Sequence, residues 1–179
     1  TLSYFELDEL DKAHGTIPPE DGSAAQLLIV EADAGGRVRV YPYDVLTGHF
    51  FPYTWEIDEP WNIDSFKYTD ARYVTAERPF FENVRISVEN ITADGCDITF
   101  NQASGKDRPD SYDIYILSGD GLVKKHLNIT SRYYLYNMPA TLTEHICGLK
   151  TRTEYTVKIV ANSFWRTRSD ALTARFATL

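Results

Sequence analysis

Apolar and polar side chains alternate in a series of short segments that fill the second half of the chain. In the clearest segment, residues 155–161, every odd position carries an apolar side chain and most even positions are polar. A period of two indicates a half-buried β-strand. The segments expected to form strands by this criterion are residues 84–88, 96–100, 112–117, 122–129, 133–136, 145–149, 155–161 and 173–177. Turn residues separate them, so the pattern predicts a self-contained, all-β, two-sheet sandwich over residues 83–179.

The start of the segment at residue 155 carries a more specific signal. Leu149 precedes Tyr155 by six residues, with Thr153 between them. A tyrosine in this place matches the tyrosine corner of immunoglobulin-like sandwiches, in which the phenol hydroxyl bonds to upstream backbone. The spacing resembles the Leu-x-Pro-x-Thr-x-Tyr signature of fibronectin type III domains, although Thr151 replaces the proline. The resemblance implies a spacer or binding module, and we expect the Tyr155 hydroxyl to bond to backbone within residues 149–152.

The first half of the chain predicts a smaller region of strands. Residues 26–31 form an apolar run typical of a buried strand, Ala34-Gly35-Gly36 predicts a turn, and residues 37–43 alternate. Together they predict a β-hairpin. Residues 2–7 and 50–57 are also expected to be extended, so that residues 1–58 are terminal strands of an incomplete domain.

Residues 59–82 are rich in aromatic side chains and show no clear period. Large aromatic side chains need packing partners, so this segment predicts an ordered connector. Trp55, Trp61 and Phe66 are expected to lie mostly buried between the N-terminal strands and the sandwich.

Two alternatives for these aromatic residues remain open. Trp55 and Trp61 flank the acidic residues Glu56, Asp58 and Glu59, an arrangement that also suits a sugar-stacking platform or a glycosidase acid pair. The tyrosine-rich residues 133–136 are a second candidate for binding a glycan or a peptide. Burial at a domain junction, with the acids on its wet rim, is the favoured interpretation.

The charge and hydropathy of the chain exclude some classes of partner. Its 26 acidic and 18 basic residues give a formal charge of −8, which argues against nucleic acid because phosphate binding needs a basic face. No apolar run approaches the roughly 18 residues that span a bilayer. The chain begins at Thr1 in strand-like sequence, which suggests a processed or trimmed protein.

Motifs for catalysis or metal binding are absent from the sequence. Cys96 should face the core and Cys147 should face outward, which predicts two unpaired thiols. The four histidines, His14, His49, His126 and His145, form no local ligand pair, and no nucleophile elbow or phosphate-binding glycine loop occurs. The sequons at Asn90 and Asn128 are short enough to arise by chance. We therefore expect no catalytic residue and no metal site in this chain.

A wider resemblance covers nearly the whole chain. It is carried by residues 3–7, 15–19, 24–31, 38–48, 131–142 and 161–164. These segments resemble the C-terminal part of calcineurin-like metallophosphoesterases of Bacteroidetes, in which a fibronectin-like domain follows the enzyme domain. The resemblance implies that the catalytic residues, which hold two divalent metal ions, lie upstream of Thr1, and it favours a periplasmic or extracellular bacterial location.

Three functions therefore stay open at this point. The chain is expected to be the non-catalytic C-terminal region of a metal-dependent phosphoesterase, whose partner is the upstream catalytic domain of the same protein. The alternatives are an accessory module that binds a glycan or a peptide, and a structural extracellular spacer. The phosphorylated substrate of the parent enzyme is not indicated by any residue of this chain.

Overall fold

The computed structural model describes residues 20–67, 69–106 and 108–179, and the strand expected over residues 2–7 and His14 lie outside them. The chain divides into two compact units. The first extends to Thr75 and includes Tyr134–Asn137, and the second comprises Ala76–Tyr133 and Met138–Leu179. The residues predicted to form a connector are thus shared between the two units.

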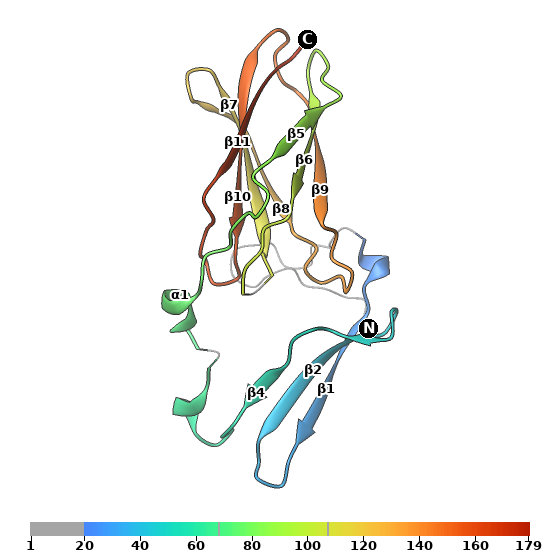
Figure 1. The fold of residues 1–179 in the computed structure, drawn as a ribbon, viewed down its shortest axis with the longest axis vertical. Helices are drawn as coiled ribbons and strands as arrows, with labels where there is room; N and C mark the ends of the chain where they lie inside the picture. The colour runs from blue at the N-terminus through green and yellow to red at the C-terminus, as the bar shows by residue number, and fades with distance from the viewer. Residues whose placement is uncertain (1–19, 68, 107) are drawn as a thin grey trace. The chain divides into compact units, whose positions relative to one another are not determined.

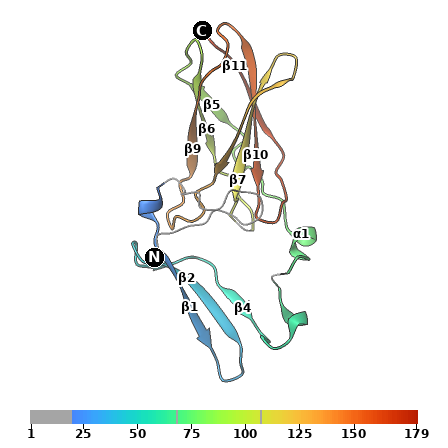
Figure 2. The ribbon, with the colours of Figure 1, turned by 180° about the vertical axis from the view of Figure 1, so that it is seen from behind.

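The second unit is a sandwich of two antiparallel sheets, as the alternating pattern predicts (Figure 1). Its three-stranded sheet has the order β5-β6-β9, with β5 at Ile86–Glu89, β6 at Cys96–Asn101 and β9 at Thr141–Ile146. Its four-stranded sheet has the order β11-β10-β7-β8, with β7 at Ser111–Ser118, β8 at Val123–Thr130, β10 at Glu154–Asn162 and β11 at Leu172–Ala177. In Figure 2 the strands β5, β6 and β9 are labelled on the left of the sandwich and β7 and β10 on the right, so the two sheets are seen side by side. The fold class predicted for this region is confirmed.

The core of the sandwich is built from the alternate positions of facing strands. Tyr112, Ile114 and Ile116 of β7 are buried, and so are the odd positions of β10. The rings of Phe100 and Tyr112 meet edge to face with centroids 5.0 Å apart, a favourable geometry for aromatic pairs. Because successive side chains point to opposite faces of a strand, a single period of two specifies the whole inward set.

The two cysteines lie as predicted. Cys96 is buried, Cys147 is exposed, and both are free thiols. Burial raises the pKa of the Cys96 thiol to about 11, so this side chain behaves as a small core residue.

One predicted strand is missing, and two others begin two or more residues from the predicted position. Residues 133–136 lie in turns and not in a strand, although Tyr134 and Leu135 are buried, because an apolar run also arises where a loop is anchored. Strand β9 begins at Thr141 instead of residue 145 and ends at Ile146, shortly before Gly148 adopts a φ of 76°. Strand β5 begins two residues late, after the Asn83 side chain accepts a hydrogen bond from the backbone of Arg85.

The first unit contains a four-stranded sheet in which the predicted hairpin is confirmed. Strand β1 (Gln26–Ala32) pairs antiparallel with β2 (Val38–Asp44), and β2 also pairs with β3 (His49–Phe50) and β4 (Trp55–Ile57). The turn between β1 and β2 is closed by the carboxylate of Asp33, which accepts hydrogen bonds from the backbone of Gly35 and Arg37. The interpretation of residues 26–31 as a buried strand is wrong, since Leu28 is 56% and Val30 61% exposed on β1, which stands at the edge of the sheet formed by the described strands.

Helical structure in the described residues is limited to single turns. These are the 3-10 helices η1 (Asp21–Ser23) and η2 (Ile63–Ser65) and the four-residue helix α1 (Arg72–Thr75). Within the described ranges, no helix has the length and apolarity needed to cross a membrane.

Candidate functional site

Trp55 and Trp61 are exposed in the first unit. The exposed fraction is 38% for Trp55 and 70% for Trp61, whereas Phe66 is half-buried. The expectation that both tryptophans lie mostly buried is therefore wrong. Trp55 lies on the short strand β4, whose one sheet neighbour among the described strands is β2.

The indole of Trp61 rests on the turn between β1 and β2. A Cβ atom added to Gly36 would lie 2.5 Å from Cζ3 of Trp61, so the ring contacts the glycine backbone directly. The turn around Trp61 is tied by the Asn62 side chain, which donates to Glu59 at 2.8 Å and accepts from the backbone of Asp64 at 3.1 Å. One large aromatic side chain is thus held in a defined place and stays largely open to solvent.

A charged depression of about 370 Å³ is lined by residues of the same hairpin. Its lining residues are Glu31, Ala32, Asp33, Arg37 and Arg39. Arg37 pairs with Asp58 at 3.1 Å, and Arg39 pairs with Glu56 at 3.4 Å. The carboxylates flanking the tryptophans therefore neutralise arginines of β2 and the preceding turn.

These ion pairs disfavour the interpretation of the acidic residues as a glycosidase acid pair. The hydrogen bond and charge of Lys67, together with the charges of Arg37 and Arg39, hold the pKa of Asp58 below its ordinary value. A general acid needs a raised pKa, which Asp58 does not have.

The tyrosine corner predicted at residue 155 is confirmed. The Tyr155 hydroxyl accepts a hydrogen bond from the backbone N–H of Lys150 at 2.9 Å, and the Tyr155 ring is buried. Leu149 is buried beside it, and its backbone N–H donates to the Asp94 carbonyl at 2.8 Å. The signature residues therefore pin the turn between β9 and β10 and have a structural role.

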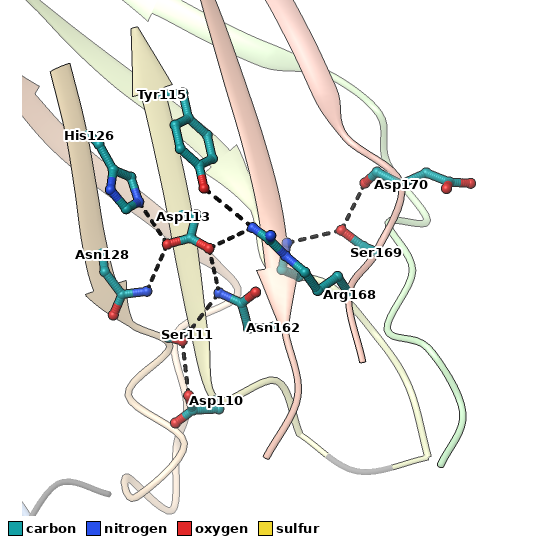
Figure 3. Close-up of polar contacts among 11 residues, drawn as sticks. Asp110, Ser111, Asp113, Tyr115, His126, Asn128, Asn162, Arg168, Ser169 and Asp170 are labelled. Carbon is teal, nitrogen blue, oxygen red and sulfur yellow. Dashed lines mark hydrogen bonds and ion pairs between the residues drawn. The ribbon is translucent and has the colours of Figure 1, made fainter. Parts of the chain in front are cut away.

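A polar cluster that sequence reasoning missed lies on the outer side of the four-stranded sheet, around Asp113 of β7 (Figure 3). Oδ1 of Asp113 accepts hydrogen bonds from His126 Nε2 at 2.9 Å and from Asn128 Nδ2 at 3.0 Å. Oδ2 accepts from Asn162 Nδ2 at 3.1 Å and from Arg168 Nη2 at 2.7 Å. One carboxylate thus connects β7 to β8, to β10 and to the loop before β11.

The electrostatics of this cluster favour an ionised carboxylate. Burial by itself raises the pKa of Asp113, but the hydrogen bonds from Asn128, His126 and Asn162 and the charge of Arg168 outweigh it. The net result is a pKa below the ordinary value for aspartate.

The cluster holds the loop between β10 and β11 against the sheet. Arg168 forms an isolated bridge with Asn162 in addition to its ion pair with Asp113. Ser169 accepts a hydrogen bond from the backbone of Ala161 at 2.9 Å. The residue opposite Asp113 in the sheet register, Val160, is only 6% exposed, so the outer side of the sheet is covered at this end.

Among the described residues, no nucleophile is hydrogen-bonded to His126 to complete a catalytic triad with Asp113. A triad requires a nucleophile hydrogen-bonded to the histidine. The hydroxyl of Ser111, which lies nearby on β7, bonds to Asp110 and Asn162. The imidazole of His126 stacks on the ring of Tyr115, with centroids 4.4 Å apart. The cluster is therefore suited to fixing strands and a loop.

The sequence contains one signal for this cluster. Asp113, Tyr115, His126 and Asn128 occupy the outward positions of two alternating segments. Without the register, which pairs Asp113 with Asn128 and Tyr115 with His126, nothing in the sequence places these side chains together. Arg168 comes from a loop, which shows no period.

Metal ligands are not grouped in the part of the chain that the structure describes. In those ranges, no three residues among histidine, cysteine, aspartate and glutamate lie close enough to hold an ion.

Comparisons with known proteins find similar solved structures at low sequence identity. The chain matches no protein-family model and no curated protein sequence. A structure described as a myokine is 16% identical with a TM-score of 0.42, covering 57% of this chain and 97% of that chain. A computationally redesigned β-sandwich protein is 22% identical with a TM-score of 0.42, covering 57% and 94%. A segment of two fibronectin type III domains from chicken tenascin is 15% identical with a TM-score of 0.44, covering 82% and 67%.

The second unit is a fibronectin type III-like sandwich. This assignment rests on its own geometry, namely sheets of three and four antiparallel strands and the hydrogen bond of the Tyr155 corner.

Proposed function

We propose that this chain is a non-catalytic accessory region of a larger protein, and that a catalytic domain of the same protein covers the sheet of the first unit. The class of enzyme that the sequence resemblance suggests is a calcineurin-like, metal-dependent phosphoesterase. In this proposal the fibronectin type III-like sandwich is an appended module, and β1 to β4 complete the edge of the enzyme domain.

The exposed apolar side chains of β1 carry this proposal. Leu28 and Val30 lie on one side of the strand, and their partners in the register are Pro42 and Val40. Trp55 pairs with Val40 from the other edge, so one face of the sheet carries a row of apolar residues, of which Leu28, Val30 and Trp55 are exposed and Pro42 is buried. We call these five residues the β1 face.

The opposite face of the same sheet is apolar in part as well. Ile29 and Phe50 are both exposed there, and Phe50 meets Tyr43 with ring centroids 5.0 Å apart. A sheet this small needs a second layer to bury such surface. Covering Leu28 and Val30 alone would contribute about 2–3 kcal/mol, which is enough to select a specific partner.

An activity assay tests the proposal directly. Two proteins are assayed on an aryl phosphate and on a phosphodiester. One is the 179-residue chain, and the other is a longer form that also contains the residues encoded upstream of Thr1. Manganese, zinc or magnesium is added in turn. We expect turnover by the longer form and none by the short chain, because hydrolysis at two metals requires ligands that position both ions. Chelator-sensitive turnover by the repurified short chain would contradict the proposal, as would an inactive longer form.

A second assay tests the covering of the β1 face. Leu28→Ser and Val30→Ser are introduced together into both forms, with Val123→Ser, an exposed position on the sandwich, as the matched control. We expect the double variant to lower the stability of the longer form by about 2–3 kcal/mol and to change the short chain little. Equal effects in both forms would show that no upstream domain packs on this face.

The position of the exposed Trp61 ring on the β1–β2 turn favours a second candidate function, that of a glycan-binding module. An open indole beside a depression with arginine and carboxylate groups has the parts of a sugar site, which are a stacking face and polar hydrogen-bonding groups. Affinity electrophoresis through gels that contain soluble polysaccharides tests it. Retardation of the wild type that is lost in Trp61→Ala and kept in Phe66→Ala would support this function, and equal mobility in all gels would exclude it for those glycans.

A further inference from the structure

A basic depression lies at one end of the sandwich, where the turn between β7 and β8 meets the tyrosine-corner turn between β9 and β10. Its volume is about 490 Å³. The lining residues are Ser118, Gly119, Asp120, Lys124, Lys125, Gly148, Leu149, Lys150, Thr153 and Tyr155. All of them belong to the second unit, so the depression is formed by one compact body.

The charge of this depression is opposite to that of the protein. It is lined by three lysines and one aspartate, whereas the whole chain has a formal charge of −8. The carboxylate of Asp120 already accepts hydrogen bonds from the Ser118 hydroxyl and from the backbone N–H of Leu122. Those hydrogen bonds hold the pKa of Asp120 below its ordinary value, so the group is satisfied as an anion within its own turn. The three lysine charges still outnumber the single carboxylate charge.

The lining includes lysine ammonium groups and the hydroxyls of Ser118, Thr153 and Tyr155, all of which can donate hydrogen bonds. The Nζ of Lys125 donates to the Cys147 carbonyl at 2.6 Å. The side chains of Lys124 and Lys150 are exposed, and the charge of Lys124 lies close enough to the Asp120 carboxylate to help lower its pKa. The Tyr155 oxygen accepts from the Lys150 backbone, which leaves its O–H hydrogen available for donation. Lysine ammonium groups bind phosphate and sulfate oxygens as point charges.

We propose that this depression binds the phosphate or sulfate ester of a small organic molecule. Its volume falls in the range of small-molecule sites and exceeds what a single inorganic anion fills. The lysines hold the anionic group, and the apolar side chain of Leu149 with the hydroxyls of Ser118 and Thr153 contacts the organic part. The site is independent of the proposed phosphoesterase domain, because none of its residues belongs to the first unit.

Calorimetric titration of the full chain tests the proposal with four probes. These are glucose 6-phosphate, glucose 6-sulfate, inorganic phosphate and glucose. We expect both esters to bind, at least about tenfold tighter than inorganic phosphate, with no binding of glucose and with affinity that falls as sodium chloride is raised. Amide chemical-shift changes should be confined to residues 118–125 and 147–155.

Substitutions at the rim locate the site. Lys124→Gln with Lys150→Gln should weaken ester binding by about tenfold or more, because two charge-assisted contacts are lost. As a control, Lys158→Gln removes one positive charge from the middle of β10, away from the depression. It should leave the affinity for the esters within twofold of wild type. Both variants should keep the wild-type melting temperature. The proposal is overturned if neither ester binds, if inorganic phosphate binds as tightly as the esters, or if the double variant keeps wild-type affinity.

Discussion

Replacing Tyr155 by phenylalanine removes a single oxygen atom from the turn before β10. That oxygen accepts the backbone N–H of Lys150 at 2.9 Å. The ring of Tyr155 is buried, so phenylalanine fills the same space and the apolar packing is kept. The variant therefore isolates the hydrogen bond of the tyrosine corner.

The expected cost follows from the donor that is left behind. An unsatisfied buried donor costs about 1–3 kcal/mol of folding free energy. Because the N–H of Lys150 is only part-buried, we expect Tyr155→Phe to lower the free energy of unfolding by roughly 1–2 kcal/mol. For a domain of about 100 residues, each kcal/mol lowers the melting temperature by roughly 4–8 °C. We expect the sandwich of the variant to melt about 5–10 °C below the wild type.

Scanning calorimetry and urea unfolding measure this loss, and two further variants calibrate it. Tyr112→Phe removes a hydroxyl that accepts the Ala103 N–H at 2.8 Å in the buried core, and it should cost more, about 2–3 kcal/mol. Tyr43→Phe removes a hydroxyl with no hydrogen bond among the described residues, and it lies in the other unit, so the sandwich should be unaffected. If Tyr155→Phe is as stable as Tyr43→Phe, the corner does not hold the turn and the structural role assigned to the signature is wrong.

Three further predictions concern the sandwich. Gly95→Ala should destabilise it by more than about 2 kcal/mol, because the new Cβ would lie 2.3 Å from the Ile146 carbonyl oxygen. Urea unfolding measures this loss, and a midpoint equal to or above that of the wild type would contradict the packing. Ile116→Ala should cost about 2–5 kcal/mol by leaving a cavity in the core, measured in the same way. Asp113→Asn should be less stable than the wild type at pH 7, and the difference should shrink as the pH falls below about 4, the ordinary aspartate pKa. The reason is that the pKa of Asp113 is lower in the folded protein than in the unfolded chain, so the ionised carboxylate stabilises the fold at neutral pH and this stabilisation is lost on acidification. A stability difference between the variant and the wild type that does not change with pH would refute this reasoning.

The sandwich was predictable because its information is local. The period of two in residues 155–161 indicates which side chains point inward, and the tyrosine-corner signature lies within seven consecutive residues. Both features depend on neighbours along the chain, so the positions of Cys96, Tyr112 and Tyr155 agree with the structure. The wrong prediction of a strand at residues 133–136 has the same origin. An apolar run indicates that side chains are buried, but it does not indicate whether the backbone forms a strand.

The polar sites depended on contacts between segments far apart in the sequence. Asp113 and Arg168 are separated by 55 residues, and the basic depression joins the turn between β7 and β8 to the turn between β9 and β10. Strand register and loop position decide such contacts, and neither is encoded in a local period.

The alternating pattern and the Leu149–Tyr155 signature by themselves determined the fold class, the inward residues and the corner hydrogen bond of the second unit. Tertiary structure decided the exposure of β1, Trp55 and Trp61, and the assembly of the Asp113 cluster and the lysine depression. The physical reason is that side-chain direction follows from backbone geometry within one strand, whereas burial depends on what packs against that strand. A run of apolar residues such as 26–31 looks the same in a covered strand and in an exposed strand.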